Sequence, residues 1–371
     1  MGPIAAHRSA ALIAAALLLG GCTREVALPP AHGAVVASGL NGPQGVYVDG
    51  QDNVWVTDSG TGGTQVVGSF PGENGPIPIT LGDTARVVRV GAGGEQTVVT
   101  SLPSLGTPFG AVGAARLTML NGETYLTSSQ WFALPGGGAQ PARTAAVLSL
   151  SGGTTTEVAN TFAWEAANNP DGVPPAEGGI DSHPYGITAL GSQLYIADAA
   201  ANTLLRLDPA TKTLATVAVF QALRVTPPGA TEPVEAQAVP TGVAAGADGA
   251  LYVALYPGGP ELPGTARIIR VDPATGAQTD YATGLSGLTD LRAGPDGDLY
   301  AVSFAPTGPG SGAIIRVKAN NVKETVLGGL NFPTSIAFNT RGDAFVTVNG
   351  VGAPGTGRVL RYDFLTQYGG Q

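Results

Sequence analysis

The segment SQLYIADA, residues 192–199, has five counterparts elsewhere in the chain. Each is an apolar or aromatic strand that follows a turn rich in Gly, Asp or Asn. The other copies are DNVWVTDS at 52–59, GETYLTSS at 122–129, GALYVALY at 249–256, GDLYAVSF at 297–304 and GDAFVTVN at 342–349. Regular recurrence of one strand pattern indicates an architecture assembled from repeated units.

Each copy lies between two further predicted strands. A short strand precedes it and opens near a Pro-x-Gly-like corner, at Pro43, Pro108, Pro184, Pro240, the degenerate Gly287 and Pro333. A third strand follows it, as in RVVRV at 86–90, TLLRLD at 203–208 and RIIRVD at 267–272. Fourth strands such as QTVVTSL at 96–102 and KETVLGGL at 323–330 close five of the units.

The sixth unit has no fourth strand of its own before the chain ends at Gln371. The segment GAVVASGL at 33–40 resembles the fourth strands and is placed to complete that unit. This pattern predicts an all-β, six-bladed β-propeller with four-stranded antiparallel blades, over residues 34–371. Closure by the N-terminal strand would leave no exposed sheet edge, and we expect a monomer.

The first two units are longer than the others because they contain insertions at about 60–84, 129–144 and 163–180. Long loops on a rigid scaffold are frequent places for function. The composition, with 56 Gly and 29 Pro in 371 residues and only 12% charged residues, agrees with many short strands and turns.

Residues 1–21 have the features of an export signal. Arg8 precedes the apolar stretch Ala10–Leu19, which is too short to span a bilayer. The segment ends in Leu19-Gly20-Gly21-Cys22, which resembles a bacterial lipobox. We therefore expect lipidation of Cys22, the only cysteine, a tether over 22–33, and a protein held outside a bacterial membrane. An ordinary signal peptide with a chance cysteine is the alternative.

Charge excludes some partners. The formal net charge is −9, and removal of residues 1–21, whose only charged residue is Arg8, makes it −10. Lys and Arg are scattered without a run, which argues against nucleic acid as a partner. The classes that remain are a small molecule, a glycan or an envelope protein.

Candidate binding residues gather in the segment that leads from the second unit into the third. They are Asn168, Asn169, Asp171, Asp181, His183 and Tyr185, and Asp290 has a similar place at the start of a later inner strand. Their oxygen atoms suit polar recognition or Ca²⁺. The alternative is that NNPDG at 168–172 is simply a turn. We expect no cofactor other than Ca²⁺, and the sequence gives no residue a catalytic role.

Two further interpretations concern single residues. His183 is the only histidine between residues 33 and 371, so a histidine dyad or a His-rich zinc site cannot be built. We expect His183 to have a structural role, in which it caps or hydrogen-bonds the corner formed by Pro184-Tyr185-Gly186. Asp58 and Asp198 end equivalent strands, and this repetition predicts a structural hydrogen-bonding role for both.

A more specific resemblance covers residues 168–304. The runs NNPDG at 168–172, DSHPYG at 181–186, YIADAAANTLLRLD at 195–208, VPTGVAAGADGALYVALYPGGPELPGTARIIRV at 239–271 and YATGLSGLTDL at 281–291 resemble the ScyD/ScyE family. These proteins are found beside scytonemin genes in cyanobacteria and resemble six-bladed NHL and SMP-30-like propellers. The resemblance implies this fold over 34–365 and implies no established activity. The family pattern has Asn where this chain has His183.

The SMP-30-like relatives also allow a test for a metal centre. The resemblance implies that a lactonase of that type would hold a divalent metal through Asn and Asp residues at the starts of inner strands. The corresponding residues here are Gln44, Phe109, Tyr185, Thr241, Leu288 and Thr334, and none is a carboxylate or a histidine. A lactonase-type centre is therefore disfavoured. Streptogramin-lyase-like propellers resemble the chain in fold but rely on histidine.

Three functions remain open from the sequence. The first is a binding module, without assigned catalysis, that uses its channel mouth. The second is a metal-assisted hydrolase or lactonase-like enzyme that uses Asp171, Asp181 and Asp290. A purely structural role in envelope assembly is the third.

Overall fold

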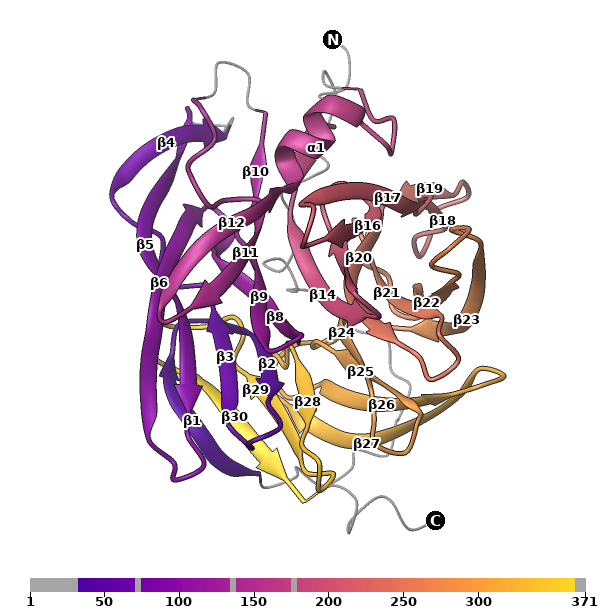
Figure 1. Ribbon diagram of the computed structural model, residues 1–371. Coiled ribbons are helices and arrows are strands. Elements are labelled where there is room, and N and C mark those ends of the chain that lie inside the picture. The colour runs from indigo at the N-terminus through magenta and orange to yellow at the C-terminus, as the bar shows by residue number, and fades with distance from the viewer. Residues whose placement is uncertain (1–32, 71–74, 134–137, 175–178, 364–371) are drawn as a thin grey trace.

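The computed structural model describes residues 33–70, 75–133, 138–174 and 179–363. These residues form six sheets of four or more strands, together with two short two-stranded sheets and one helix. Figure 1 shows the sheets arranged around a common centre, with the colour running once around the ring from indigo to yellow. The all-β propeller class predicted from the sequence is confirmed.

The insertions lie in blades one and two and in the segment that leads into blade three. Blade one contains β2 (Pro43–Val48), β3 (Val54–Asp58), β5 (Ile77–Val90), β6 (Gln96–Thr107) and β7 (Gly110–Val112), with β4 (Gln65–Phe70) paired to β5. Blade two contains β8 (Ala114–Leu120), β9 (Glu123–Ser128), β11 (Ala146–Ser151) and β12 (Thr154–Asn160). Blade three contains β14 (Pro184–Leu190), β15 (Gln193–Asp198), β16 (Thr203–Asp208) and β17 (Thr213–Val219).

The other three blades are four-stranded. Blade four contains β20 (Ala238–Ala245), β21 (Leu251–Pro257), β22 (Ala266–Val271) and β23 (Gln278–Leu285). Blade five contains β24 (Leu288–Ala293), β25 (Leu299–Ser303), β26 (Gly312–Lys318) and β27 (Val322–Leu330). Blade six contains β28 (Ile336–Phe338), β29 (Ala344–Val348), β30 (Gly357–Tyr362) and, from the N-terminal end, β1 (Ala34–Leu40).

The ring closes as the sequence predicted. Strand β1 pairs antiparallel with β30, with Ala34 opposite Arg361 and Leu40 opposite Gly357. In Figure 1 the indigo β1 lies with the yellow β30 in one sheet. The innermost strands contact one another in the order β2, β8, β14, β20, β24, β28 and back to β2.

The hydrophobic core is divided among the blade interfaces, because each blade buries both of its faces. One cluster lies at every junction between neighbouring blades; Leu204 and Val253, for example, belong to the cluster between blades three and four. Burial of such side chains contributes roughly 1.5–3 kcal/mol each. The same strand therefore needs apolar residues at successive positions, as in LYVALY at 251–256.

Threonine hydroxyls link the blades near the axis. They donate to main-chain carbonyl oxygens of the next blade at five of the six junctions among the described residues: Thr57 to Ala115, Thr127 to Tyr185, Thr241 to Leu288, Thr289 to Pro333 and Thr334 to Pro43. At the junction of blades three and four, Ala197 stands where Thr57 and Thr127 stand in their blades.

The innermost strands of five blades share a β-bulge near their start, for example between Pro43 and Gly45 and between Leu288 and Asp290. A bulge places one extra residue on the strand and redirects its side chain. The extra residues include Gln44, Tyr185 and Thr241, as the corners predicted.

At two corners the position predicted from the sequence was wrong. In blade two the β6–β7 hairpin occupies the predicted corner, so the innermost strand begins at Ala114 and Phe109 lies in the hairpin turn. In blade five the bulge follows Leu288, so Thr289 and not Leu288 is the equivalent residue. Neither replacement, Ala115 or Thr289, is a carboxylate or a histidine.

The three predicted insertions form local structure. Strand β4 pairs with the long β5, and β10 (Trp131–Phe132) pairs with β13 (Asp181–Ser182). Helix α1 (Thr161–Asn168) begins at Asn160, whose side chain accepts a hydrogen bond from the Ala163 N–H at 2.8 Å, and ends at Asn169 in the left-handed conformation, φ 40°. A second hairpin is made by β18 (Leu223–Val225) and β19 (Val234–Ala236).

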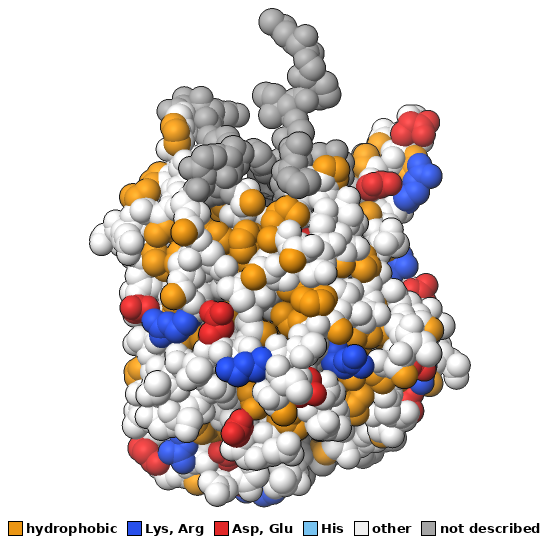
Figure 2. Space-filling view, turned by 45° about the horizontal axis from the view of Figure 1, so that its top comes forward, with side chains coloured by type: hydrophobic (Ala, Val, Ile, Leu, Met, Phe, Trp, Pro, Cys, Tyr) orange, Lys and Arg blue, Asp and Glu red, His pale blue; other side chains and the backbone are white. Residues whose placement is uncertain are grey.

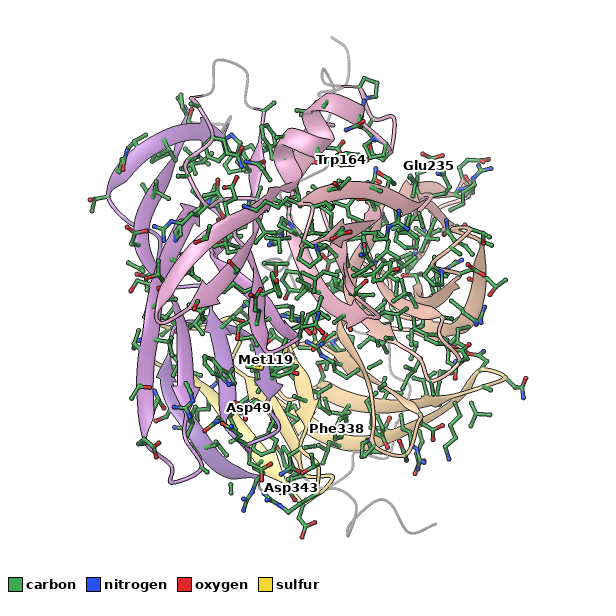
Figure 3. All side chains as sticks on the ribbon, viewed as in Figure 1. Asp49, Met119, Trp164, Glu235, Phe338 and Asp343 are labelled. Carbon is green, nitrogen blue, oxygen red and sulfur yellow. The ribbon has the colours of Figure 1, made fainter. Side chains whose placement is uncertain are left out.

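Helix α1 is fixed to blade three by its tryptophan. The Trp164 indole donates to the Thr216 hydroxyl of β17 at 3.1 Å, and Figure 3 shows this residue beside the helix and β17. The predicted signal segment, Cys22 and residues 22–32 of the tether lie outside the described residues. Within the described part of the chain, no helix has the length and apolarity needed to cross a bilayer.

Candidate functional site at the channel mouth

A cavity of about 420 Å³ lies at one mouth of the central channel. Its lining comes from the starts of innermost strands, from the β6–β7 hairpin and from the loops that follow the second strand of every blade except the third. Representative residues from the six blades are Gln44, Gln130, Tyr185, Tyr256, Phe304 and Phe332. The volume lies within the usual range of small-molecule sites, roughly 300–1,000 Å³.

A hydrogen-bonded pair forms part of the inner lining. The Tyr185 hydroxyl donates to Gln44 Oε1 at 2.7 Å, while Gln44 Nε2 donates to the carbonyl oxygens of Gly350 at 3.0 Å and Gly42 at 3.3 Å. Burial raises the pKa of Tyr185, so its hydroxyl stays protonated. Both side chains are therefore neutral and held in fixed orientations.

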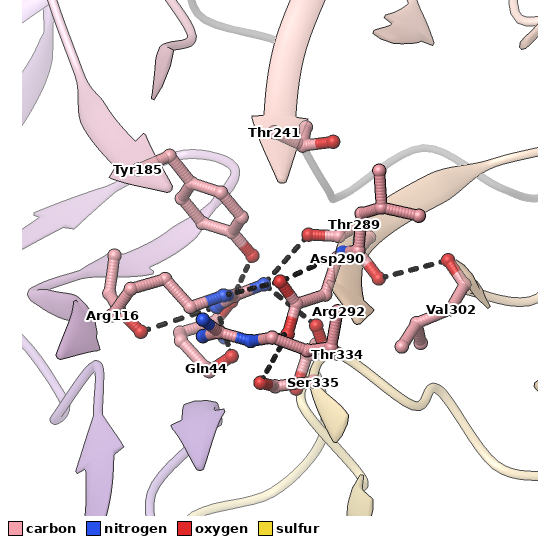
Figure 4. A network of polar contacts seen from close by, with 12 residues as sticks. Gln44, Arg116, Tyr185, Thr241, Thr289, Asp290, Arg292, Val302, Thr334 and Ser335 are labelled. Carbon is pink, nitrogen blue, oxygen red and sulfur yellow. Dashed lines mark hydrogen bonds and ion pairs between the residues drawn. The ribbon is translucent and has the colours of Figure 1, made fainter. Parts of the chain in front are cut away.

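The channel axis itself is filled by Arg116, which is fully buried. Its guanidinium donates to the carbonyl oxygens of Thr289 and Thr334, both at 2.7 Å, and to those of Gln44 and Ala115. Figure 4 shows these bonds converging on Arg116 from different blades. The guanidinium also lies 4.4 Å from the centre of the Tyr185 ring.

Asp290 neutralises this buried cation from the far side of the ring. It belongs to blade five and Arg116 to blade two, so the two residues face each other across the axis; Arg116 Nε and Asp290 Oδ1 are 3.5 Å apart. Asp290 Oδ2 accepts from the Ser335 hydroxyl at 2.5 Å and also faces Arg292 at 3.5 Å. The carboxylate is therefore fully engaged in holding the ring together.

Several aromatic side chains belong to the walls of the cavity. The rings of Phe304 and Phe332 have centroids 5.3 Å apart. Phe109, 40% exposed, is supported by Phe70, with ring centroids 6.0 Å apart. Phe70 in turn packs on Phe132 of β10, so the insertions of blades one and two share an aromatic cluster that positions Phe109.

One carboxyl group lines the cavity. Glu261 Oε2 accepts a hydrogen bond from the Tyr256 hydroxyl at 2.7 Å. Burial raises the pKa of Glu261, and the Tyr256 hydrogen bond opposes this shift. The pKa of Tyr256 is also raised, first by burial and then by the adjacent Glu261 carboxylate. No Lys or Arg is among the described residues that line the cavity.

His183 is a neutral group in the cavity wall. Burial, with a contribution from the Arg116 charge, lowers the pKa of His183 to about 4. Its ring packs edge-on against Tyr185, with centroids 5.3 Å apart, and its Nδ1 has no hydrogen-bond partner among the described residues. A histidine with such a low pKa is a weak base at neutral pH, but it can still exchange hydrogen bonds with a ligand.

The structure divides the predicted site residues among three places. His183 and Tyr185 line the cavity. Asp290 lies beneath it and binds Arg116. Asn168, Asn169, Asp171 and Asp181 belong to α1, the turn after it and β13, and none of them lines the cavity. Asn168 and Asp171 make local hydrogen bonds, to the Trp164 carbonyl and from the Val173 N–H.

Asp58 and Asp198 have the structural role predicted for them. Asp58 accepts from the Asn41 N–H at 3.0 Å and from Arg86. Asp198 accepts from the His183 N–H at 2.7 Å and from the Ser182 hydroxyl at 2.6 Å. Each carboxylate holds the segment that leads into the innermost strand of its own blade.

The sequence reading missed Arg116, Gln130, Tyr256, Glu261 and the phenylalanines. Tyr256 and Phe304 end two of the six repeated strands, and this common position was the signal that could have found them. Arg116 could not be found from the sequence. The corner of blade two was predicted at Pro108, whereas the bulge that contains Arg116 lies between Ala114 and Leu117. No group of three or more His, Cys, Asp and Glu side chains in the described part of the chain is placed to hold a metal ion.

Comparison with known proteins gives the fold and no more. No protein-family model and no curated protein matches the chain. Among solved structures, a gluconolactonase from Xanthomonas campestris has a TM-score of 0.52 at 12% identity, with 88% of this chain and 89% of that chain covered. The calcium-binding protein regucalcin from Agrobacterium tumefaciens C58 has a TM-score of 0.50 at 11% identity, with coverages of 89% and 94%.

A luciferin-regenerating enzyme also has a TM-score of 0.50, at 11% identity and with coverages of 88% and 92%. The chain shares the propeller fold of these proteins. This supports, at the level of fold, the sequence resemblance to SMP-30-like propellers. Identities this low do not transfer an activity.

Proposed function

We propose that this protein is a binding propeller whose channel mouth takes up a small, uncharged and largely apolar molecule. The observation that carries the proposal is the 420 Å³ cavity with several aromatic side chains in its walls and an inner end closed by neutral polar groups. A flat apolar body would pack on Phe304, Phe332 and Phe109. A polar substituent would reach His183 or Gln130 at the inner end.

Electrostatics narrows the class of ligand. The lining holds no described cation, and Arg116 is already satisfied by four carbonyl oxygens and Asp290. An anionic ligand would therefore gain no charge-assisted hydrogen bond and would meet Glu261. A neutral aromatic or terpenoid-like molecule would lose little hydration energy on entering.

The matched pair Ala111→Trp and Ala210→Trp tests this proposal. Ala111 lines the cavity, whereas Ala210 is exposed in the turn between β16 and β17. We expect neutral aromatic compounds to raise the melting temperature of the wild type and of Ala210→Trp but not of Ala111→Trp. A ligand at one hundred times its Kd adds about 2.7 kcal/mol of stability. Equal responses in all three proteins would place binding elsewhere and refute the proposal.

A metal-assisted hydrolase is the second candidate function, and one observation bears on it. Asp171, Asp181 and Asp290 do not share the cavity, so Glu261 is the only carboxyl group in the described lining that could act on a bound substrate. Its raised pKa suits a general acid or base. Hydrolysis of lactones or esters that is lost in Glu261→Gln would favour this candidate. A Glu261→Gln variant that binds ligand, with no turnover by the wild type, favours the binding module.

We further propose that the protein belongs to the ScyD/ScyE type and is exported and lipid-anchored through Cys22. The motifs at 168–304 and the Leu-Gly-Gly-Cys segment at 19–22 support this. In cells, the wild type should partition into the detergent phase of a Triton X-114 extract, and Cys22→Ser should move to the aqueous phase. Identical partitioning of the two proteins would contradict the anchor.

A further inference from the structure

Helix α1 carries a buried carboxyl group that the cavity does not use. Glu165 is only 1% exposed, and neither Oε1 nor Oε2 has a hydrogen-bond partner among the described residues. An ionised carboxylate removed from water without hydrogen bonds or a counter-charge is strongly destabilising, so without a cation this group stays protonated. Both of its oxygen atoms remain available to a ligand that the described residues do not supply.

The charges that act on Glu165 are all negative. Burial is the main cause that raises the pKa of Glu165 to about 9, and the carboxylates of Asp171, Asp198 and Asp181 raise it further. Asp198 is engaged by the His183 and Ala201 N–H groups and by Ser182. The charged side chains that act on Glu165 are all carboxylates, so a cation bound beside it would be attracted, and none of these side chains supplies a positive charge.

Two neutral oxygen atoms of the same region are also buried without a donor. They are Oδ1 of Asn169 and Oδ1 of Asn202. The amide nitrogens of both residues are already used: Asn169 Nδ2 donates to the Val173 carbonyl at 3.0 Å, and Asn202 Nδ2 donates to Asp171 Oδ2 at 3.0 Å. Their oxygen atoms remain as acceptors.

These residues belong to one connected unit. The Asn169 N–H donates to the Glu165 carbonyl at 2.7 Å, and Asp171 joins the turn after α1 to Asn202 of blade three. The base of the helix is tied to the same blade, because the Thr161 and Ser182 hydroxyls are 2.6 Å apart and Ser182 donates to Asp198. The buried carboxyl group of Glu165 is close enough to Asp171, Asp181 and Asp198 for their charges to act on it, so it lies near the turn after α1, β13 and the end of β15.

We infer that a hard divalent cation of the Ca²⁺ class binds Glu165 in this region, with the amide oxygens of Asn169 and Asn202 as further ligands. Since no three His, Cys, Asp and Glu side chains of the described residues are placed to hold a metal, carboxylates alone do not make this site. Ca²⁺ commonly combines one or two carboxylates with amide and main-chain oxygens and with water in flexible geometry. Asp171, Asp181 and Asp198 would add a favourable negative potential.

The site is separate from the channel mouth, since neither Glu165, Asn169 nor Asn202 lines the cavity. Helix α1, which carries Glu165, contacts β13, whose last residue, Ser182, precedes His183. A cation there would fix α1 and β13 to blade three. The inference therefore stands or falls independently of the ligand proposed for the cavity.

Thermal unfolding and calorimetric titration of the purified protein with CaCl₂ and EDTA test the inference. The variant is Glu165→Gln, and the matched control is Glu261→Gln, which changes a carboxyl group of the cavity whose pKa burial also raises. We expect Ca²⁺ to raise the melting temperature of the wild type and of Glu261→Gln by several degrees, and EDTA to reverse it. Glu165→Gln should show neither the shift nor the heat of binding.

In EDTA the Glu165→Gln variant should be at least as stable as the wild type, because a neutral amide replaces the buried acid. Loss of the site can therefore be distinguished from failure to fold. Circular dichroism in EDTA checks that the variant is folded. A wild type that shows no heat and no shift at millimolar Ca²⁺ would overturn the inference. A full Ca²⁺ response in Glu165→Gln would overturn it as well.

Discussion

Arg116 holds the centre of the ring together, because it joins blades one, two, five and six through hydrogen bonds to their carbonyl oxygens. Its partner Asp290 is 1% exposed. A buried pair of this kind is costly to break, because the group that remains is left charged and out of water. The side chain is therefore structural.

The first prediction concerns this residue. Arg116→Met should lower the free energy of unfolding by about 3–5 kcal/mol, because it leaves Asp290 and several carbonyl oxygens without their donor. Arg267→Met is the control, since its pair with Asp280 is 3.4 Å long and solvent-exposed and should contribute less than about 1 kcal/mol. Urea unfolding measures both. Equal losses in the two variants would contradict the role of Arg116.

The second prediction concerns His183 and pH. Burial and the Arg116 charge lower the pKa of His183 to about 4 in the folded protein, against about 6.5 when unfolded. Between these values only the unfolded chain takes up the proton, so the contribution of His183 is present above pH 6.5 and is lost as the pH falls to 4. His183→Asn should remove this loss, which amounts to about 3 kcal/mol.

Chemical denaturation of the wild type and of His183→Asn at pH 7.5 and pH 4.5 measures the difference. Asp198, whose pKa burial raises to about 6, binds the main-chain N–H of residue 183 and so titrates in both proteins. Its effect therefore cancels in the comparison. Parallel stability curves for the two proteins would show that His183 titrates normally.

Among the elements, the closing strand β1 matters most for the integrity of the ring. It supplies the outer strand of blade six, and its register places Leu40, fully buried, and Val35, 54% exposed, in one strand. The third prediction is that Leu40→Ala costs about 2–5 kcal/mol while Val35→Ala costs less than about 0.5 kcal/mol. Urea unfolding of the two variants checks it. Similar small costs would mean that β1 is not needed to close the ring.

The strands were predictable from the sequence because their information is local and repeated. The copies around Trp55, Tyr195 and Tyr300 each follow a turn, and the closing strand resembles the fourth strands that it replaces. The corner of blade two was not predictable in this way. The β6–β7 hairpin displaces it by a pairing of Leu105 with Val112 that local pattern does not reveal.

The candidate site was less predictable than the fold, since it depends on contacts between distant blades. The corner at Pro184 directs attention to His183 and Tyr185, and both residues line the cavity. The oxygen-rich loop before it was grouped with them by sequence proximity, but pairing of β13 with β10 and the packing of α1 keep Asn168, Asn169 and Asp171 away from the cavity. Asp290 meets Arg116 only through closure of the whole ring.

At the scale of the whole molecule, the insertions and the cavity belong to one face. The insertions follow Ser59, Gln130 and the end of blade two, and the first two of these residues line the cavity. On the face that Figure 2 shows, hydrophobic side chains are spread over the upper and middle part, and charged side chains lie mostly lower and at the edges, several of them with opposite charges side by side. This surface suits a neutral ligand better than a polyanion.

Hydrogen–deuterium exchange of the wild type, with and without a neutral aromatic compound that stabilises it, tests the central claim most directly. We predict slower exchange in the segments that form the mouth, at 107–113, 256–261 and 349–354, and unchanged exchange in the outer strands β12, β17 and β23. Protection confined to the outer strands, or none at saturating compound, would contradict a ligand site at the channel mouth.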